Sequence, residues 1–154
     1  MSNNRVFNEL KELYSIYNNI EICKGESSNN KYIIIKDYND TIYKIVVDQD
    51  YPFKGPLYFF INDISLKTYL TVPIKLQKYL KILYGKDCLC CSSLLCMNNW
   101  QPLCNLKQVI DEYKNTKIIK KNILSYYLCD LIKIKYNCGF AHIYEYLLYE
   151  YLYK

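Results

Sequence analysis

The 154-residue chain lacks the sequence features of a membrane protein or a secreted protein. No apolar run approaches the roughly 20 residues that a helix needs to cross a bilayer. The first nine residues are polar and do not resemble a secretory signal. We therefore expect an intracellular protein, cytoplasmic or nuclear, that has no membrane partner.

Alanine, arginine and histidine are each nearly missing, with one residue apiece: Ala141, Arg5 and His142. Tyrosine is instead abundant, with 19 residues. In so skewed a composition, a single tyrosine, lysine or asparagine says little about function. The net charge of +5 arises from lysines that are dispersed rather than clustered, which is typical of a solvated surface. We therefore expect no nucleic-acid partner.

The chain contains eight cysteines but does not need disulfides to fold. Hydrophobic residues make up 51% of the sequence, enough to bury a core at this length, and reduced thiols are typical of intracellular proteins. Five cysteines lie from 88 to 104, but their spacing lacks the paired C-x2-C of common zinc modules. The neighbouring cysteines at 90 and 91 are also not expected to point easily at one ion together. We expect no metal or other cofactor, with structural zinc as the alternative.

Hydrophobic periodicity predicts one helix followed by short strands in the first half of the chain. Val6, Leu10 and Leu13 recur at helical spacing and predict a helix at 3–17. Short runs rich in β-branched residues, separated by turn residues, predict four strands. They lie at 20–23, 32–35, 41–47 and 57–61. We expect these strands to form an antiparallel meander.

The second half predicts helices on either side of a cysteine-rich loop at 88–96. Pro73 can open a helix and Gly85 can end it. The expected helices lie at 73–84, 106–113, 118–135 and 140–153. His142, four residues after Cys138, lies on the last of these helices, where we expect no catalytic Cys–His pair. The whole chain, 1–154, is therefore predicted to be a single α+β domain with helices packed on one sheet.

Three of the four prolines lie in two short motifs. Residues 51–56 read Tyr-Pro-Phe-Lys-Gly-Pro, and residues 100–102 read Trp-Gln-Pro, just before a predicted helix. The first motif is similar to the YPFKPP loop of the ubiquitin-conjugating (UBC-like) family, although Gly55 replaces one proline. The second motif resembles that family's W-x-P segment, and the first helix, with Arg5 and Glu9, resembles the family's first helix. The resemblance covers nearly the whole chain and implies a UBC-like fold.

In that family, a cysteine just before the W-x-P segment carries ubiquitin or a related modifier as a thioester. Cys90 matches the family pattern best, because leucine precedes it, serine follows two residues later and leucine four residues later. Cys88 is the alternative, since Gly85-x-x-Cys88-Leu89 resembles the family's G-x-x-C-L, and Cys91 is a third candidate. The resemblance thus implies Cys90 as the catalytic acceptor.

Two features of the family are missing, and they leave a second function open. The HPN tripeptide should precede the cysteine, but no histidine or asparagine occurs from 63 to 97. Losing an oxyanion donor typically slows a reaction about a hundredfold or more. The family's G-P-P-containing stretch before the YPFK loop is also missing. The resemblance therefore implies either a ubiquitin-conjugating-type acyltransferase or an inactive UBC-variant or RWD-like adaptor, whose YPxxxP pattern residues 51–56 also match.

The resemblance also implies a surface for protein partners. In the family, the phenylalanine of the YPFK loop and the proline of W-x-P lie side by side and meet the ligase. Those residues correspond to Phe53 and Pro102. The basic residue of the first helix, which meets the activating enzyme and the ligase, corresponds to Arg5. The expected partners are ubiquitin or a ubiquitin-like protein, an activating enzyme and a ligase-type protein.

Overall fold

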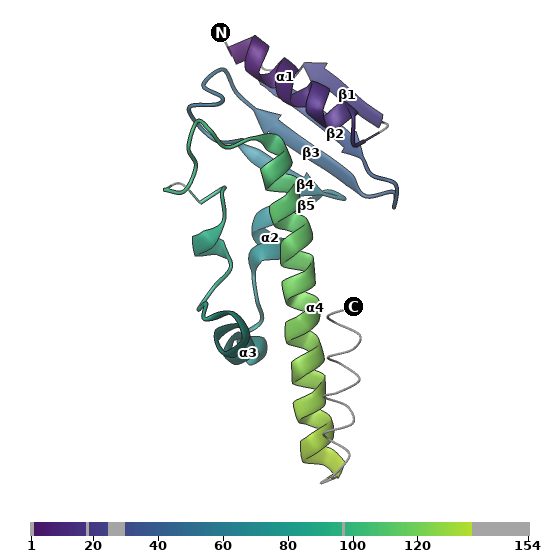
Figure 1. The fold of residues 1–154 in the computed structure, drawn as a ribbon, viewed down its shortest axis with the longest axis vertical. Helices are drawn as coiled ribbons and strands as arrows, with labels where there is room; N and C mark the ends of the chain where they lie inside the picture. The colour runs from purple at the N-terminus through teal and green to yellow at the C-terminus, as the bar shows by residue number, and fades with distance from the viewer. Residues whose placement is uncertain (1, 18, 25–29, 97, 137–154) are drawn as a thin grey trace. The chain divides into compact units, whose positions relative to one another are not determined.

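The computed structural model, drawn in Figure 1, describes residues 2–17, 19–24, 30–96 and 98–136. The predicted last helix, with Cys138 and His142, lies outside these residues. The chain divides into two compact units: Met1–Thr71 with Cys90–Lys114, and Val72–Leu89 with Asn115–Lys154. The single domain expected from the sequence stays a prediction.

The first unit contains a helix followed by an antiparallel sheet. Helix α1 spans Ser2–Tyr14. The five strands lie in the sheet in chain order: β1 (Asn19–Lys24), β2 (Lys31–Lys36), β3 (Ile42–Val47), β4 (Tyr58–Ile61) and β5 (Ile64–Ser65). Each strand pairs antiparallel with its neighbour. The α+β class is therefore confirmed, and β5 adds a fifth strand that the sequence did not predict.

Strand β5 exists because a two-residue turn follows β4. Asn62 and Asp63 have φ angles of 47° and 62°, which asparagine and aspartate adopt more readily than most residues. The Asn62 side chain also accepts a hydrogen bond from the β3 backbone at 2.8 Å. The chain then enters a short helix, α2 (Leu66–Leu70), where the Ser65 hydroxyl accepts a hydrogen bond from the Lys67 N–H at 3.3 Å. The sequence prediction missed this helix as well.

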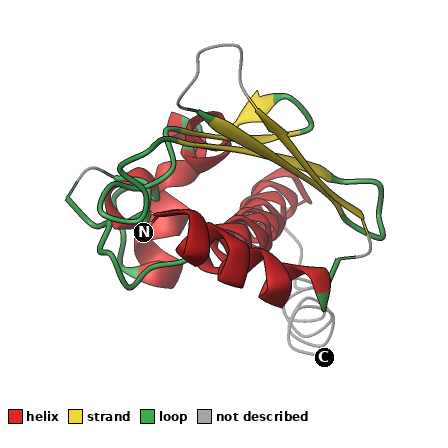
Figure 2. Ribbon diagram, turned by 90° about the horizontal axis from the view of Figure 1, so that it is seen from above, coloured by secondary structure: helices red, strands yellow, loops and turns green. Residues whose placement is uncertain are grey.

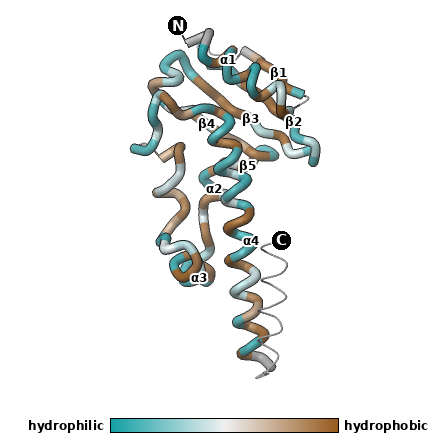
Figure 3. Tube along the Cα trace, in the orientation of Figure 1, coloured by the Kyte–Doolittle hydropathy of each residue, from teal (hydrophilic) through white to brown (hydrophobic). Residues whose placement is uncertain are grey.

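The core of the first unit lies between the sheet and α1. Successive side chains of a strand face opposite sides, and on the inner face Ile33, Ile35 and Ile45 have no exposed surface. Helix α1 buries Leu10 and Leu13, and Figure 2 shows it lying against one face of the sheet. In Figure 3 its trace changes between hydrophilic and hydrophobic colours, as expected for an amphipathic helix.

The second unit pairs α3 with the later part of the last described helix. Helix α3 (Ile74–Tyr84) begins after Pro73 and ends at Gly85, which has a left-handed φ of 64°. These ends confirm the prediction that Pro73 opens this helix and that Gly85 ends it. The Tyr79 hydroxyl donates a hydrogen bond to the Asp130 carboxylate at 2.6 Å, and this bond ties the two helices of the unit together.

Helix α4 runs without a break over Leu106–Tyr136. The sequence predicted two helices here, at 106–113 and 118–135, and that division is wrong. The polar run at 114–117 contains neither glycine nor proline, and Thr116 within it is buried. The helix contributes its first turns to the first unit and the rest to the second. Among the described residues, no helix combines the length and the apolar character needed to span a bilayer.

Candidate functional site

A buried carboxylate joins three distant parts of the first unit. Glu9 on α1 is 6% exposed. Its Oε2 atom accepts hydrogen bonds from the Tyr51 hydroxyl at 2.6 Å and from the Leu106 N–H at 2.9 Å. Its Oε1 atom accepts a hydrogen bond from Arg5 Nε. Both oxygens of the carboxylate therefore accept hydrogen bonds, which fix the 51–56 segment and the start of α4 against α1.

Trp100 brings the two proline motifs together. Its indole Nε1–H donates a hydrogen bond to the Pro52 carbonyl at 2.8 Å, and its ring centroid lies 5.8 Å from that of Tyr51. A Cβ atom added at Gly55 would lie 3.0 Å from Trp100 Cδ2. The indole thus occupies the space that a side chain at Gly55 would need, which accounts for glycine at this position. We call the following residues the anchor cluster: Arg5, Glu9, Tyr51, Trp100 and Leu106.

The cysteine segment, defined as residues 90–96, lies in the same unit. Cys90 begins a short 3₁₀ helix, Cys90–Ser92, and both Cys90 and Cys91 are exposed. Their Sγ atoms lie 4.0 Å apart, so the two thiols lie close together, contrary to the expectation that they could not easily face one ion. Cys88, the alternative acceptor, is half-exposed and belongs to the second unit. The structural-zinc alternative stays a prediction.

A few polar bonds hold the cysteine segment in place. The Asn99 side-chain amide donates hydrogen bonds to the Cys91 carbonyl at 2.7 Å and to the Ser93 carbonyl at 2.9 Å. The Glu112 carboxylate on α4 accepts a hydrogen bond from the Leu94 N–H at 2.9 Å. The sequence analysis did not identify Asn99, because the family's asparagine precedes the cysteine whereas Asn99 follows it. An asparagine in a loop is itself a signal, because its side-chain amide commonly forms hydrogen bonds with nearby backbone groups.

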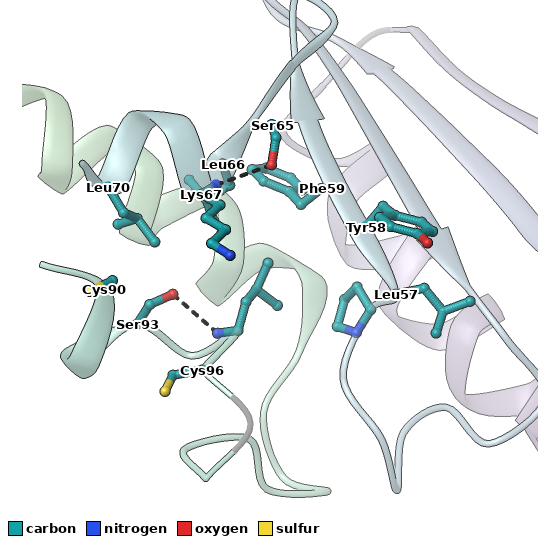
Figure 4. A pocket seen from close by; sticks show the side chains of 12 residues that line it. Leu57, Tyr58, Phe59, Ser65, Leu66, Lys67, Leu70, Cys90, Ser93 and Cys96 are labelled. Atoms are coloured by element: carbon teal, nitrogen blue, oxygen red, sulfur yellow. Dashed lines mark hydrogen bonds between the residues drawn. The ribbon is translucent and has the colours of Figure 1, made fainter.

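Cys90 lines a groove of about 450 Å³ between the cysteine segment and the sheet. The groove walls come from the start of β4, from α2 and from the cysteine segment, and Figure 4 shows how the side chains line it. Most lining residues are apolar: Pro56, Leu57, Tyr58, Phe59, Leu66, Leu70 and Leu95. The others are Ser65, Lys67, Cys90, Ser93 and Cys96. Such a groove can hold an extended apolar segment beside an exposed thiol.

The residues expected to bind partners lie in different environments. Phe53 is 79% exposed, and Pro102 is also exposed. They belong to the two motifs that the Trp100–Pro52 hydrogen bond joins. Arg5 is only partly exposed, and its guanidinium also donates a hydrogen bond to the Cys104 carbonyl at 3.3 Å. Arg5 therefore has a structural role within the unit, and its part in partner binding stays a prediction.

Comparisons of the chain with protein-family models, curated proteins and solved structures found no match in any of the three. The UBC-like resemblance therefore depends on the motifs and their order. The geometry adds that the motif residues Tyr51 and Trp100 belong to one packed cluster.

Proposed function

We propose that this chain is a ubiquitin-conjugating-type protein of UBC-like fold that carries ubiquitin or a ubiquitin-like modifier as a thioester on Cys90. The observation that carries the proposal is the exposed Cys90 thiol on an apolar groove. The same compact unit contains the anchor cluster, which includes residues of both proline motifs. A reactive thiol next to a groove is what a carrier of an extended peptide tail requires.

The chemistry needs little beyond an accessible thiolate. The Cys90 thiolate attacks the carbonyl carbon of a thioester presented by an activating enzyme. A new C–S bond forms, the old C–S bond breaks, and the activating enzyme's thiolate leaves. Because one thioester replaces another, the step needs less stabilisation of charge than attack by an amine. The apolar wall formed by Leu66, Leu70 and Leu95 would hold apolar side chains of the modifier's tail.

An inactive adaptor of the same fold is the second candidate. None of the described residues that line the groove is an asparagine or a histidine. The nearby Asn99 amide already donates to two carbonyls of the cysteine segment. The groove therefore has no side-chain amide in the role of an oxyanion donor. This observation favours an adaptor that binds pathway proteins through an exposed surface at Phe53 and Pro102.

The test is a charging reaction with activating enzyme, ubiquitin and ATP, repeated with other ubiquitin-like modifiers. We expect an adduct of chain plus modifier on a non-reducing gel, and dithiothreitol should remove it. Cys90→Ala should form no adduct. Cys90→Ser should form an adduct that resists dithiothreitol, because the bond is then an oxygen ester. Cys91→Ala is the matched control and should still be charged.

The outcome separates the two candidates. An adduct lost in Cys88→Ala but kept in Cys90→Ala would move the acceptor to the alternative cysteine. If no modifier forms a thiol-sensitive adduct, the carrier function is wrong. Binding of ubiquitin or a ligase that weakens in Phe53→Ala would then support the adaptor.

A further inference from the structure

Lys67 shares the groove with Cys90. It is the only lysine or arginine among the described residues that line the groove. Figure 4 shows its side chain extending from α2 into the groove, toward the segment that carries Cys90 and Ser93. No carboxylate of the described residues forms a salt bridge with Lys67, whereas Lys54 in the same unit pairs with Asp50. An amine without a salt-bridge partner among the described residues thus lines the same groove as the exposed thiol.

The backbone at Lys67 is held firmly while its side chain remains exposed. Leu66 is 1% exposed and Leu70 is 6% exposed, so α2 is anchored on both sides of the lysine. The Ser65 hydroxyl accepts a hydrogen bond from the Lys67 N–H. The backbone of Lys67 is therefore fixed, while its flexible four-carbon side chain can place the amine at different positions in the groove.

We propose that Lys67 is an acceptor amine for the acyl group carried on Cys90, so that the chain modifies itself. The inference rests on the proposed carrier function. The Lys67 ammonium first loses a proton to solvent, and the amine then attacks the carbonyl carbon of the thioester. A C–N bond forms, the C–S bond breaks, and Cys90 leaves as a thiolate. The product is an isopeptide amide on Lys67, and the reaction needs no oxidant, reductant or further reactant.

Proximity explains why this reaction can proceed without an asparagine in the groove. Losing an oxyanion donor costs about a hundredfold to a thousandfold in rate. Well-oriented intramolecular reactions reach effective concentrations of about 10⁵ M or more. An amine held in the same groove as the thioester can therefore offset the missing donor, whereas a lysine of another protein receives no such advantage. The groove geometry favours transfer within the chain over transfer to a distant substrate.

The experiment is a single-turnover chase. The chain is charged with activating enzyme, ubiquitin and ATP, charging is stopped by removing ATP and magnesium, and the adduct is followed with and without dithiothreitol. We expect the thiol-sensitive adduct to convert into a resistant one. In Lys67→Arg this conversion should slow about tenfold or more, because arginine keeps the charge but does not form the amide. Mass spectrometry of tryptic peptides should find the modifier's C-terminal remnant on Lys67.

Two controls make the result decisive. Lys54→Arg changes an exposed lysine of the same unit outside the groove and should leave the conversion unchanged. A parallel arm replaces activating enzyme and ubiquitin with a short apolar peptide thioester, which can charge Cys90 chemically and should also acylate Lys67.

A thioester that forms but converts equally fast in Lys67→Arg overturns this inference and leaves the carrier function standing. Absence of a Lys67 amide in both arms also overturns it, and absence of any enzymatic thioester rejects the carrier function.

Discussion

The anchor cluster and the cysteine segment belong to the same compact unit but are held in different ways. In the anchor cluster, Tyr51 has no exposed surface and the buried Glu9 accepts three hydrogen bonds. In the cysteine segment, Cys90 and Cys91 are exposed, and Asn99 and Glu112 supply the polar bonds from outside the segment. The motif residues that carry the family resemblance thus mainly build the fold. The residue that would carry the chemistry lies in an exposed part of a connecting segment, as reactive residues often do.

The largest effect should come from removing the carboxylate of the anchor cluster. Glu9→Ala leaves the Tyr51 hydroxyl and the Leu106 N–H without an acceptor, and Arg5 without its carboxylate. We expect the free energy of unfolding to fall by about 3–5 kcal/mol, measured by urea denaturation. Glu12→Ala removes an exposed carboxylate from the same helix and should change the free energy of unfolding by less than about 0.5 kcal/mol. A loss of less than about 1 kcal/mol in Glu9→Ala would contradict the view that this cluster anchors the fold.

A smaller effect that depends on pH is expected from Tyr51→Phe. Near neutral pH, losing the hydrogen bond to Glu9 should cost about 1–3 kcal/mol. Burial, together with that bond, raises the pKa of Tyr51 well above its ordinary value. The folded state therefore keeps the phenolic proton where the unfolded chain, with a tyrosine pKa of about 10, begins to lose it.

The stabilisation from Tyr51 is consequently present below about pH 10 and is lost as the pH rises further. The wild-type chain should lose up to about 1.4 kcal/mol more per pH unit than Tyr51→Phe. Urea denaturation at pH 9, 10 and 11 measures both slopes. Parallel slopes for the two proteins would show that Tyr51 does not titrate differently in the folded and unfolded states.

The contact between the two proline motifs is tested by Gly55→Ala. The added methyl group would lie 3.0 Å from Trp100 Cδ2, and the indole cannot move far without stretching its hydrogen bond to the Pro52 carbonyl. We expect a loss of about 1–2 kcal/mol from this crowding. Because Trp100 is the only tryptophan, its fluorescence should also change. Lys54→Ala, in the same loop, is the control, and equal effects from both changes would exclude crowding as the cause.

The smallest effect on global stability should come from the cysteine segment. Asn99→Ala removes the two hydrogen bonds to the Cys91 and Ser93 carbonyls and should cost about 1 kcal/mol or less. Hydrogen exchange of the backbone amides in the cysteine segment should nevertheless become faster, because local opening requires less free energy. Asn98→Ala changes an exposed neighbour and should leave that exchange unchanged. A cooperative loss of exchange protection across the whole sheet would contradict the expectation that the cysteine segment opens independently of the anchor cluster.

Sequence periodicity predicted the elements that local patterns specify. The first four strands and α3 lie close to their expected places. Runs of β-branched residues specify a strand, and proline and glycine specify the ends of a helix, within a few neighbouring residues. The turn at Asn62 and Asp63 carried a usable signal, but a strand as short as β5 has too few residues to show a period. The single helix α4 was missed because the polar run at 114–117 resembles a loop, although nothing in it breaks a helix.

The sequence by itself determined the α+β class, the two proline motifs and a short window of candidate cysteines. It did not show that Glu9 would bond both Tyr51 and Leu106, which lie 42 and 97 positions away in the chain. Nor did it show that Lys67 and Cys90 would line one groove. Both facts depend on contacts between segments that only folding brings together, and no local pattern of residue types contains that information. Tertiary packing therefore decided which residues anchor the unit and which amine shares the groove with the thiol.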